Sequence, residues 1–210
     1  QQHLEAVKDA FPNWLKDRMT GGLLSCPSLV YQGKKEGYFE HTDQMEYHYE
    51  TAGLKETEIV VSLLTGQFAS EEDWKSRVTE NGSAGISLEE NQKWWKDYFD
   101  RSYIYIDEDH PGSEYWKIGR NYQLFRYMLG CNYYGKWPTK FNGGLFTFYE
   151  RFTPDYRNWS GTEFTAQNQR LVYWPMLKSG DFDAMKPQFD FYNHLLEAGK
   201  MRALGYWGED

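Results

Sequence analysis

The hydrophobic pattern of the chain changes its period near residue 70. Before that point, short apolar or alternating runs such as Leu29–Tyr31 and Ile59–Leu64 are separated by Gly and charged residues, a pattern typical of strands. After it, apolar residues recur every three or four positions, which predicts amphipathic helices. We therefore expect an α+β protein with a β-rich region and linker at residues 1–69 and helical hairpins at residues 70–210.

Serine residues mark the starts of three predicted helices. Ser70 and Ser87 each stand three residues before an acidic residue, which is the spacing of a capping box. Ser113 precedes a third helical pattern, which Gly130 is expected to end. These signals are local, so the sequence predicts helices that begin at about residues 70, 87 and 113.

The last two predicted helices form a pair. One extends from about residue 164 to residue 178, and the next begins at Phe182. Apolar residues in the second recur at spacings of three and four, which predicts one buried stripe: Met185, Phe189, Tyr192 and Leu196. Between them, Gly180 is expected to end the first helix and Asp181 to cap the second. A connection this short predicts an antiparallel αα-hairpin.

Composition narrows the classes of function. Aromatic residues make up 19% of the 210 residues, and the formal net charge is −8. The acidic balance argues against nucleic acid as a partner, because phosphate binding needs a surplus of Lys and Arg. No stretch approaches the roughly 18 consecutive apolar residues of a membrane-spanning helix. Two cysteines, Cys26 and Cys131, are too few for a disulfide framework or a zinc cluster. Tyr and Trp carry polar groups, so we expect a core that opens onto a ring-lined groove.

Two residue groups suggest chemistry but favour a structural role. Glu46, His48 and Glu50 share one face of a predicted strand, yet three ligands on a flat strand rarely converge on a tetrahedral metal site. Cys131 follows a predicted helix end, and no spacing pairs it with a histidine. The sequence contains no Gly-rich phosphate loop, HExxH or GxSxG pattern. We therefore expect no metal and no cofactor.

The longest predicted loop, about residues 131–162, mixes aromatic rings with hydrogen-bonding side chains. Rings stack on the apolar faces of sugars, and polar side chains bind sugar hydroxyl groups. The segment that follows, residues 164–175, places amides at the start of a helix. Two interpretations stay open at this point. The rings line a sugar-binding groove, or they fill a helix bundle while the amides cap backbone groups.

Three segments resemble the core motif of the six-hairpin glycosidases: Gly135–Trp137, Asp155–Trp159 and Asn168–Pro175. The likeness is closest to glycoside hydrolase family 95, the α-L-fucosidase and α-L-galactosidase family, and to its secreted relatives from gut-type bacteria. The helix Trp94–Ser102 is similar to the family's WWxxFWxRS helix. The resemblance covers about residues 90–200 and implies the opening hairpins of an (α/α)6 toroid, preceded by the end of a β-sandwich-like domain.

The resemblance carries over residue by residue to the start of the predicted helix at 164–178. The family's second active-site Asn falls on Asn168, which would hold or polarise the attacking water. The first falls on Ala166, which has no polar group for this task. The family's general-acid carboxylate lies well downstream, and only 42 of the 210 residues follow Asn168. The resemblance therefore implies the front part of a larger enzyme, incomplete as a toroid and without its proton donor.

The activity that the resemblance implies is hydrolysis of α-linked hexose or deoxyhexose glycans by an inverting attack of water. We expect substrate contacts from six residues: Trp137, Lys140, Asn142, Arg157, Trp159 and Gln169. We expect catalytic roles for three: Asn168, which positions water, and the carboxylates Asp155 and Glu163. A non-catalytic glycan-binding or scaffold protein on the same fold is the alternative, and Ala166 favours it. A lyase would instead need a Tyr/His pair in the groove, which no spacing singles out.

The predicted partner is an oligosaccharide or glycan, with no nucleic acid and no membrane insertion. The resemblance implies a secreted or periplasmic bacterial protein of carbohydrate metabolism. The chain begins Gln1-Gln2-His3 without Met, so we expect a processed chain or a fragment. No sequence signal predicts an oligomeric state.

Overall fold

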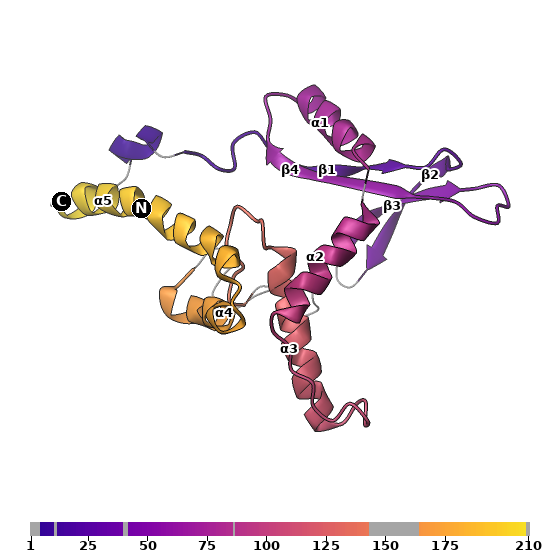
Figure 1. The fold of residues 1–210 in the computed structure, drawn as a ribbon. Helices are drawn as coiled ribbons and strands as arrows, with labels where there is room; N and C mark the ends of the chain where they lie inside the picture. The colour runs from indigo at the N-terminus through magenta and orange to yellow at the C-terminus, as the bar shows by residue number, and fades with distance from the viewer. Residues whose placement is uncertain (1–4, 11, 40–41, 86, 143–163, 209–210) are drawn as a thin grey trace. The chain divides into compact units, whose positions relative to one another are not determined.

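The computed structural model describes residues 5–10, 12–39, 42–85, 87–142 and 164–208 (Figure 1). The chain divides into two compact units, Asp9–Ser87 and Leu88–Asp210, the second of which also includes Gln1–Lys8. Strands precede the helices along the chain, after a short 3-10 helix η1 at Glu5–Ala10. This order confirms the predicted α+β class with a β-rich N-terminal region.

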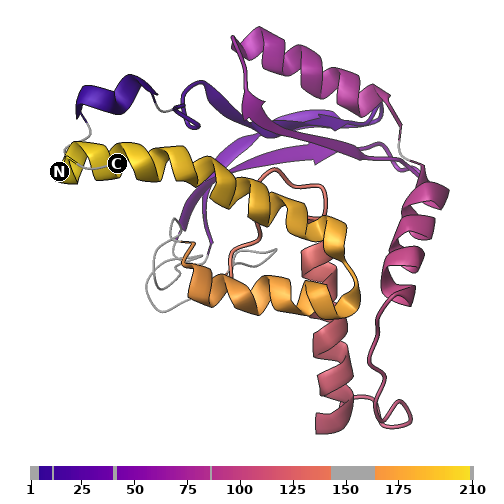
Figure 2. The same ribbon diagram turned by 60° about the vertical axis from the view of Figure 1, so that its left-hand side comes forward.

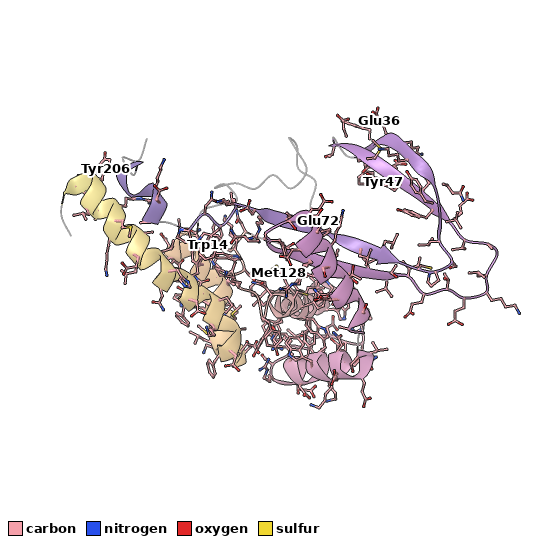
Figure 3. The ribbon with its side chains drawn as sticks, turned by 90° about the horizontal axis from the view of Figure 1, so that it is seen from above. Trp14, Glu36, Tyr47, Glu72, Met128 and Tyr206 are labelled. Atoms are coloured by element: carbon pink, nitrogen blue, oxygen red, sulfur yellow. The ribbon has the colours of Figure 1, made fainter. Side chains whose placement is uncertain are left out.

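The first unit contains two antiparallel strand pairs. β1 (Arg18–Ser25) pairs with β4 (Val60–Gln67), and β2 (Val30–Phe39) pairs with β3 (Thr42–Glu50). The apolar runs that predicted strands thus lie in strands. Side chains of the β2–β3 hairpin are largely exposed on both faces, as Figure 3 shows for Tyr47 and Glu36.

Helix α1 (Glu71–Ser83) packs against the β1–β4 pair (Figure 2). The Ser70 side chain accepts a hydrogen bond from the backbone N–H of Asp73 at 3.2 Å, which confirms the predicted helix start. Trp74 donates its indole N–H to the carbonyl of Leu64 on β4 at 3.2 Å, and Val78 is buried. One face of α1 therefore covers this strand pair.

The second unit is helical in its described residues. Ser113 accepts from the backbone N–H of Trp116 at 3.1 Å and begins α3 as predicted, and α2 begins directly after Ser87. None of the described helices is both long enough and apolar enough to cross a bilayer. The elements after residue 87 are α2 (Leu88–Asp100), α3 (Glu114–Cys131), α4 (Ala166–Ser179), the 3-10 helix η2 (Phe182–Met185) and α5 (Lys186–Trp207).

Helices α4 and α5 run antiparallel, as Figure 2 shows. Near the start of α4, Gln169 donates to Gln188 of α5 at 2.9 Å. Further back along the chain, the carbonyl of Phe164 accepts from the hydroxyl of Tyr192 at 3.0 Å. The earlier residue, Phe164, thus contacts the later position on α5, and the later residue, Gln169, contacts the earlier position. The two segments therefore run in opposite directions. The predicted antiparallel pair, a helix at about residues 164–178 followed by a second one, is confirmed. The second α-helix begins at Lys186, after η2, and not at Phe182.

The core of the helical unit lies where α2, α3, α4 and η2 meet. Trp94, Trp95, Phe99 and Phe125 flank this core and are partly buried. Seven buried residues form its centre: Tyr98, Leu129, Tyr133, Val172, Met176, Ala184 and Met185. The rings on α2 and α3 are therefore packing residues, as their helical spacing predicts.

The predicted stripe on the last helix is wrong at two positions. Phe189 and Leu196 are 55% and 58% exposed, whereas Met185 and Gln188 are buried. The reason is the 3-10 turn η2, which holds Met185 at about three residues per turn before α5 begins. A continuous α-helix from Phe182 would have kept all four apolar residues on one face.

Gly180 ends α4 in the left-handed conformation, with φ of +76°. A Cβ in this conformation costs about 1–2 kcal/mol, so Gly180→Ala is expected to lower the free energy of unfolding by about that amount. Gly199 lies inside α5, where nothing lies within 4 Å of an added Cβ. Gly199→Ala is therefore the matched control and should raise stability by about 1 kcal/mol. Urea unfolding of both variants tests this, and equal shifts of the same sign would contradict it.

Candidate functional site

A buried amide joins the loop after α3 to the first turn of α4. The Gln169 carbonyl oxygen accepts from the backbone N–H of Phe141 at 2.6 Å. Its amide nitrogen donates to the backbone carbonyl of Thr139 at 3.0 Å. Segments almost thirty residues apart in sequence are therefore joined side by side. This is the place where the sequence predicts a sugar-binding loop and a water-holding Asn.

Gln169 is 0% exposed, and its amide nitrogen also donates to the Gln188 side chain at 2.9 Å. Both ends of the amide are engaged by the protein, so neither is presented to a ligand. The expectation of direct sugar contact from Gln169 is replaced by a positioning role. Gln169 fixes the loop against α4 and α5.

A second amide fixes the same loop from the other side. Asn132, the residue that caps the end of α3, donates to the backbone carbonyl of Trp137 at 2.8 Å and to the hydroxyl of Thr139 at 3.1 Å. The backbone turns tightly around this side chain at Gly135, where an added Cβ would lie 1.9 Å from the Asn132 side-chain oxygen Oδ1. The loop is therefore held by contacts to both α3 and α4.

Three predicted sugar-contact residues lie in this loop. Trp137 is half-buried, and its ring meets that of Phe191 on α5 edge to face, with 6.2 Å between the centroids. Lys140 is largely buried, and its ammonium group donates to the Asn142 side chain at 2.6 Å. The same ammonium group lies 4.5 Å from the centroid of the Phe141 ring. The structure thus brings Trp137, Lys140 and Asn142 into one short, anchored segment.

Asn168 lies on the first turn of α4, next to Gln169, and is half-buried. Its side-chain carbonyl accepts from the hydroxyl of Thr165 at 2.7 Å. Asn168 is thus less buried than Gln169, the residue that follows it. The neighbouring position Ala166 is exposed.

Four predicted site residues lie outside the described residues. They are the candidate carboxylates Asp155 and Glu163 and the predicted sugar contacts Arg157 and Trp159. Their roles stay predictions.

An interior charge cluster close to the hairpin was missed from the sequence. Asp181 is 1% exposed and pairs with Arg126 of α3 at 3.0 Å and with Arg101 at 2.9 Å. The hydroxyl of Ser179 also donates to its carboxylate. The sequence predicts Asp181 as a helix cap, but it makes no capping hydrogen bond to η2. Its carboxylate instead neutralises buried arginine.

Arg126 also binds the C-terminal end of α2. Its guanidinium donates to the carbonyls of Tyr98, at 2.8 Å, and of Ser102. The hydroxyl of Tyr98 donates in return to the Arg126 carbonyl at 2.8 Å. Burial raises the pKa of Tyr98, and the nearby Asp181 carboxylate raises it further, so the phenol stays neutral. The sequence contains a signal for this buried arginine, because Arg126 falls on the apolar face of α3 with Tyr122 and Leu129.

The acidic strand considered for a metal site is engaged in ordinary surface pairs. Glu46 pairs with Lys35 at 3.1 Å and approaches His48 at 3.6 Å. The hydrogen bond from Lys35 holds the pKa of Glu46 below its usual value. Across the described ranges, no group of three His, Cys, Asp or Glu side chains is arranged to hold a metal ion.

Comparison with known proteins gives one result. Residues 1–104 match the N-terminal domain of the family described as a domain of unknown function (DUF5703). This match covers the strand unit and α2 but neither the loop at 137–142 nor α4. No curated protein and no solved structure matches the chain.

Proposed function

We propose that this chain belongs to a carbohydrate-active protein, a glycoside hydrolase that cleaves α-linked hexose or deoxyhexose glycans by an inverting attack of water. Its helical unit would be the opening hairpins of an (α/α)6 toroid. One observation carries the proposal. Gln169 joins the ring-bearing loop to the first turn of α4, beside Asn168. The resemblance to glycoside hydrolase family 95 assigns a water-holding role to Asn168.

The loop supplies groups of the kind that bind sugars. An indole such as Trp137 offers an apolar surface to the C–H face of a pyranose. The amide nitrogen of Asn142, a half-buried residue, is a donor of the kind that binds sugar hydroxyl groups. Lys140 is largely buried and donates to the Asn142 side-chain oxygen, so its role is to orient this amide. Because Gln169 and Asn132 fix the loop backbone, these groups are held in place before a sugar binds, which lowers the entropy lost on binding.

Asn168 would hold the attacking water. Its side-chain oxygen accepts one hydrogen bond from Thr165 and has a second lone pair. A water that donates a hydrogen to this lone pair keeps its own lone pair free for the anomeric carbon. The water oxygen then bonds to that carbon while the glycosidic C–O bond breaks. One carboxyl group takes a proton from the water and another protonates the departing oxygen. Asp155 and Glu163 are the nearest carboxylates in this chain, whereas the resemblance places the family's own proton donor well downstream of Asn168.

A non-catalytic glycan-binding protein is the second candidate function. Ala166 is exposed at the position where the family has its first active-site Asn. An alanine there cannot share the task of holding water with Asn168. The same loop would still bind a sugar, so binding without cleavage would identify this alternative.

The test measures sugar release and sugar binding with Asn168→Ala. Aryl α-L-fucosides and α-L-galactosides serve as substrates, and the corresponding oligosaccharides serve as ligands for calorimetry. Loss of one group that positions the reacting water is expected to lower kcat about 100- to 1,000-fold with little change in KM. Gln167→Ala, at an exposed neighbouring position, is the matched control and should leave both unchanged. If wild-type protein neither cleaves nor binds such glycans, the proposal is wrong.

A further inference from the structure

A small, partly open cavity is lined by residues from the end of α3, the anchored loop and the α4–α5 hairpin. Its volume is about 10 Å³ for the centre of a water-sized sphere, which is the space that one water molecule needs. Polar side chains of the loop and helices form part of its wall: Asn132, Thr139, Tyr173 and Gln188. The apolar part of the wall includes Leu129, Val172 and Ala184.

Gln188, one of the residues that line this cavity, carries an unpaired hydrogen-bond donor. The residue is 5% exposed, and its carbonyl oxygen accepts from Gln169. Its amide nitrogen is buried and has no hydrogen-bond partner among the described residues. A buried donor without an acceptor is rare, because its hydrogen bonds to water have been removed and nothing replaces them. An acceptor that fills the cavity would remove this penalty.

The other polar groups of the wall suit a molecule that both accepts and donates. The Thr139 hydroxyl oxygen accepts from Asn132 at 3.1 Å, so its own hydrogen remains available for donation. The Thr139 backbone carbonyl accepts from Gln169 and has a second lone pair. A buried water typically makes two to four hydrogen bonds to groups of this kind.

We propose that one water molecule is bound in this cavity and accepts a hydrogen bond from the amide nitrogen of Gln188. This water adds a link between α5 and the loop, beside the direct links made by Gln169 and Asn132. The inference does not rest on the proposed glycosidase function, because it concerns only how the loop is held.

Tyr192 is the alternative partner for the Gln188 amide. It lies one turn further along α5, and its hydroxyl donates to the Phe164 carbonyl at 3.0 Å. Burial raises the pKa of Tyr192, while a hydrogen-bonding interaction with the Gln188 side chain lowers it in part. The Gln188 amide nitrogen nevertheless lies outside good hydrogen-bond geometry with every described acceptor, and this hydroxyl is among them. Tyr192→Phe therefore separates the two partners.

The first experiment detects the water by NMR on the full chain. Cross-relaxation between a long-lived water and the Gln188 side-chain amide protons is expected in the wild type. It should persist in Tyr192→Phe, which removes the alternative hydroxyl partner but no group of the cavity wall. Absence of the signal in the wild type, or its loss in Tyr192→Phe, would overturn the proposal.

The second experiment fills the cavity. Ala184→Val adds two methyl groups to the apolar wall and displaces the water, so the cross-relaxation should vanish and the urea midpoint should fall. Ala203→Val, on the later part of α5 and away from the cavity, is the control for the poorer helix propensity of Val. A rise in the Ala184→Val midpoint would show an empty apolar void and overturn the proposal. If this variant does not fold, the NMR comparison decides alone.

Discussion

Replacing Arg126 with Met is expected to lower the free energy of unfolding by about 3–5 kcal/mol, the cost of breaking a buried ion pair at one partner. Arg126 and Asp181 are each 1% exposed, so the remaining carboxylate would stay buried without its hydrogen bonds from the Arg126 guanidinium. Arg101 and Ser179 remain as its partners, which places the expected loss at the lower end of this range. The variant would also leave the carbonyls at the end of α2 without their donor. Urea unfolding followed by tryptophan fluorescence measures the effect.

Two control variants show how much of the lost stability comes from burial of the Arg126–Asp181 pair and how much from removal of a charge. Lys93→Met removes an exposed partner of Asp97, with side chains 74% and 60% exposed, and should leave the urea midpoint nearly unchanged because solvent screens this pair. The double variant Arg126→Met, Asp181→Leu removes both buried charges and should be less destabilising than the sum of the single variants. A loss below about 1 kcal/mol for Arg126→Met alone would show that the pair does not hold together α3, the end of α2 and the connection between α4 and η2.

Much of the fold could be predicted because the signals that begin and end its elements are local. Ser70 and Ser113 accept hydrogen bonds from residues three positions later, and Gly180 takes the left-handed conformation within its own turn. The change from period two to period 3.6 near residue 70 marks where strands give way to helices. Each of these features depends on residues within one turn or one strand, so the sequence alone carries them. The two compact units instead divide after Ser87, because α1 packs on the β1–β4 pair.

The errors arise where distant contacts decide the outcome. The Ser-Gly-Asp connection is consistent with a capping Asp, but Asp181 is drawn inward because Arg126, 55 residues earlier, needs a buried counter-charge. In the same way, η2 shifts the face that α5 buries, so Phe189 is exposed while Gln188 is covered. A helical pattern specifies a face only when the phase of the helix is already known.

The site shows the same limit within two adjacent residues. The sequence predicts that Asn168 and Gln169 both belong to a polar helix start facing the loop. Neighbouring residues on a helix point about 100° apart, so only one of them can reach inward at this position. The structure buries Gln169 against the loop and leaves Asn168 half-buried at its edge. Residue type alone does not show that the Gln169 amide positions the loop while Asn168 is the amide proposed to bind water.

Gln169→Met is the variant expected to alter the site most. Met fills a similar volume but leaves the Phe141 N–H, the Thr139 carbonyl and the Gln188 carbonyl without their partner. Each unsatisfied buried group costs about 1–3 kcal/mol, and partial relaxation of the loop should limit the total to about 3 kcal/mol. Hydrogen exchange at the Phe141 amide should accelerate more than the global loss of stability explains, because the loop is released from α4.

Gln167→Met is the matched control for this experiment. Gln167 has the same side chain two positions earlier, is exposed, and should change stability by less than about 0.5 kcal/mol. If the loop presents the sugar-contact groups, Gln169→Met should also weaken glycan binding while Gln167→Met does not. Equal stability and equal Phe141 exchange in the two variants would show that Gln169 does not position the loop. A loss of stability without any change in glycan binding would instead separate the positioning role from the proposed function, because the loop would then be anchored for a reason other than sugar recognition.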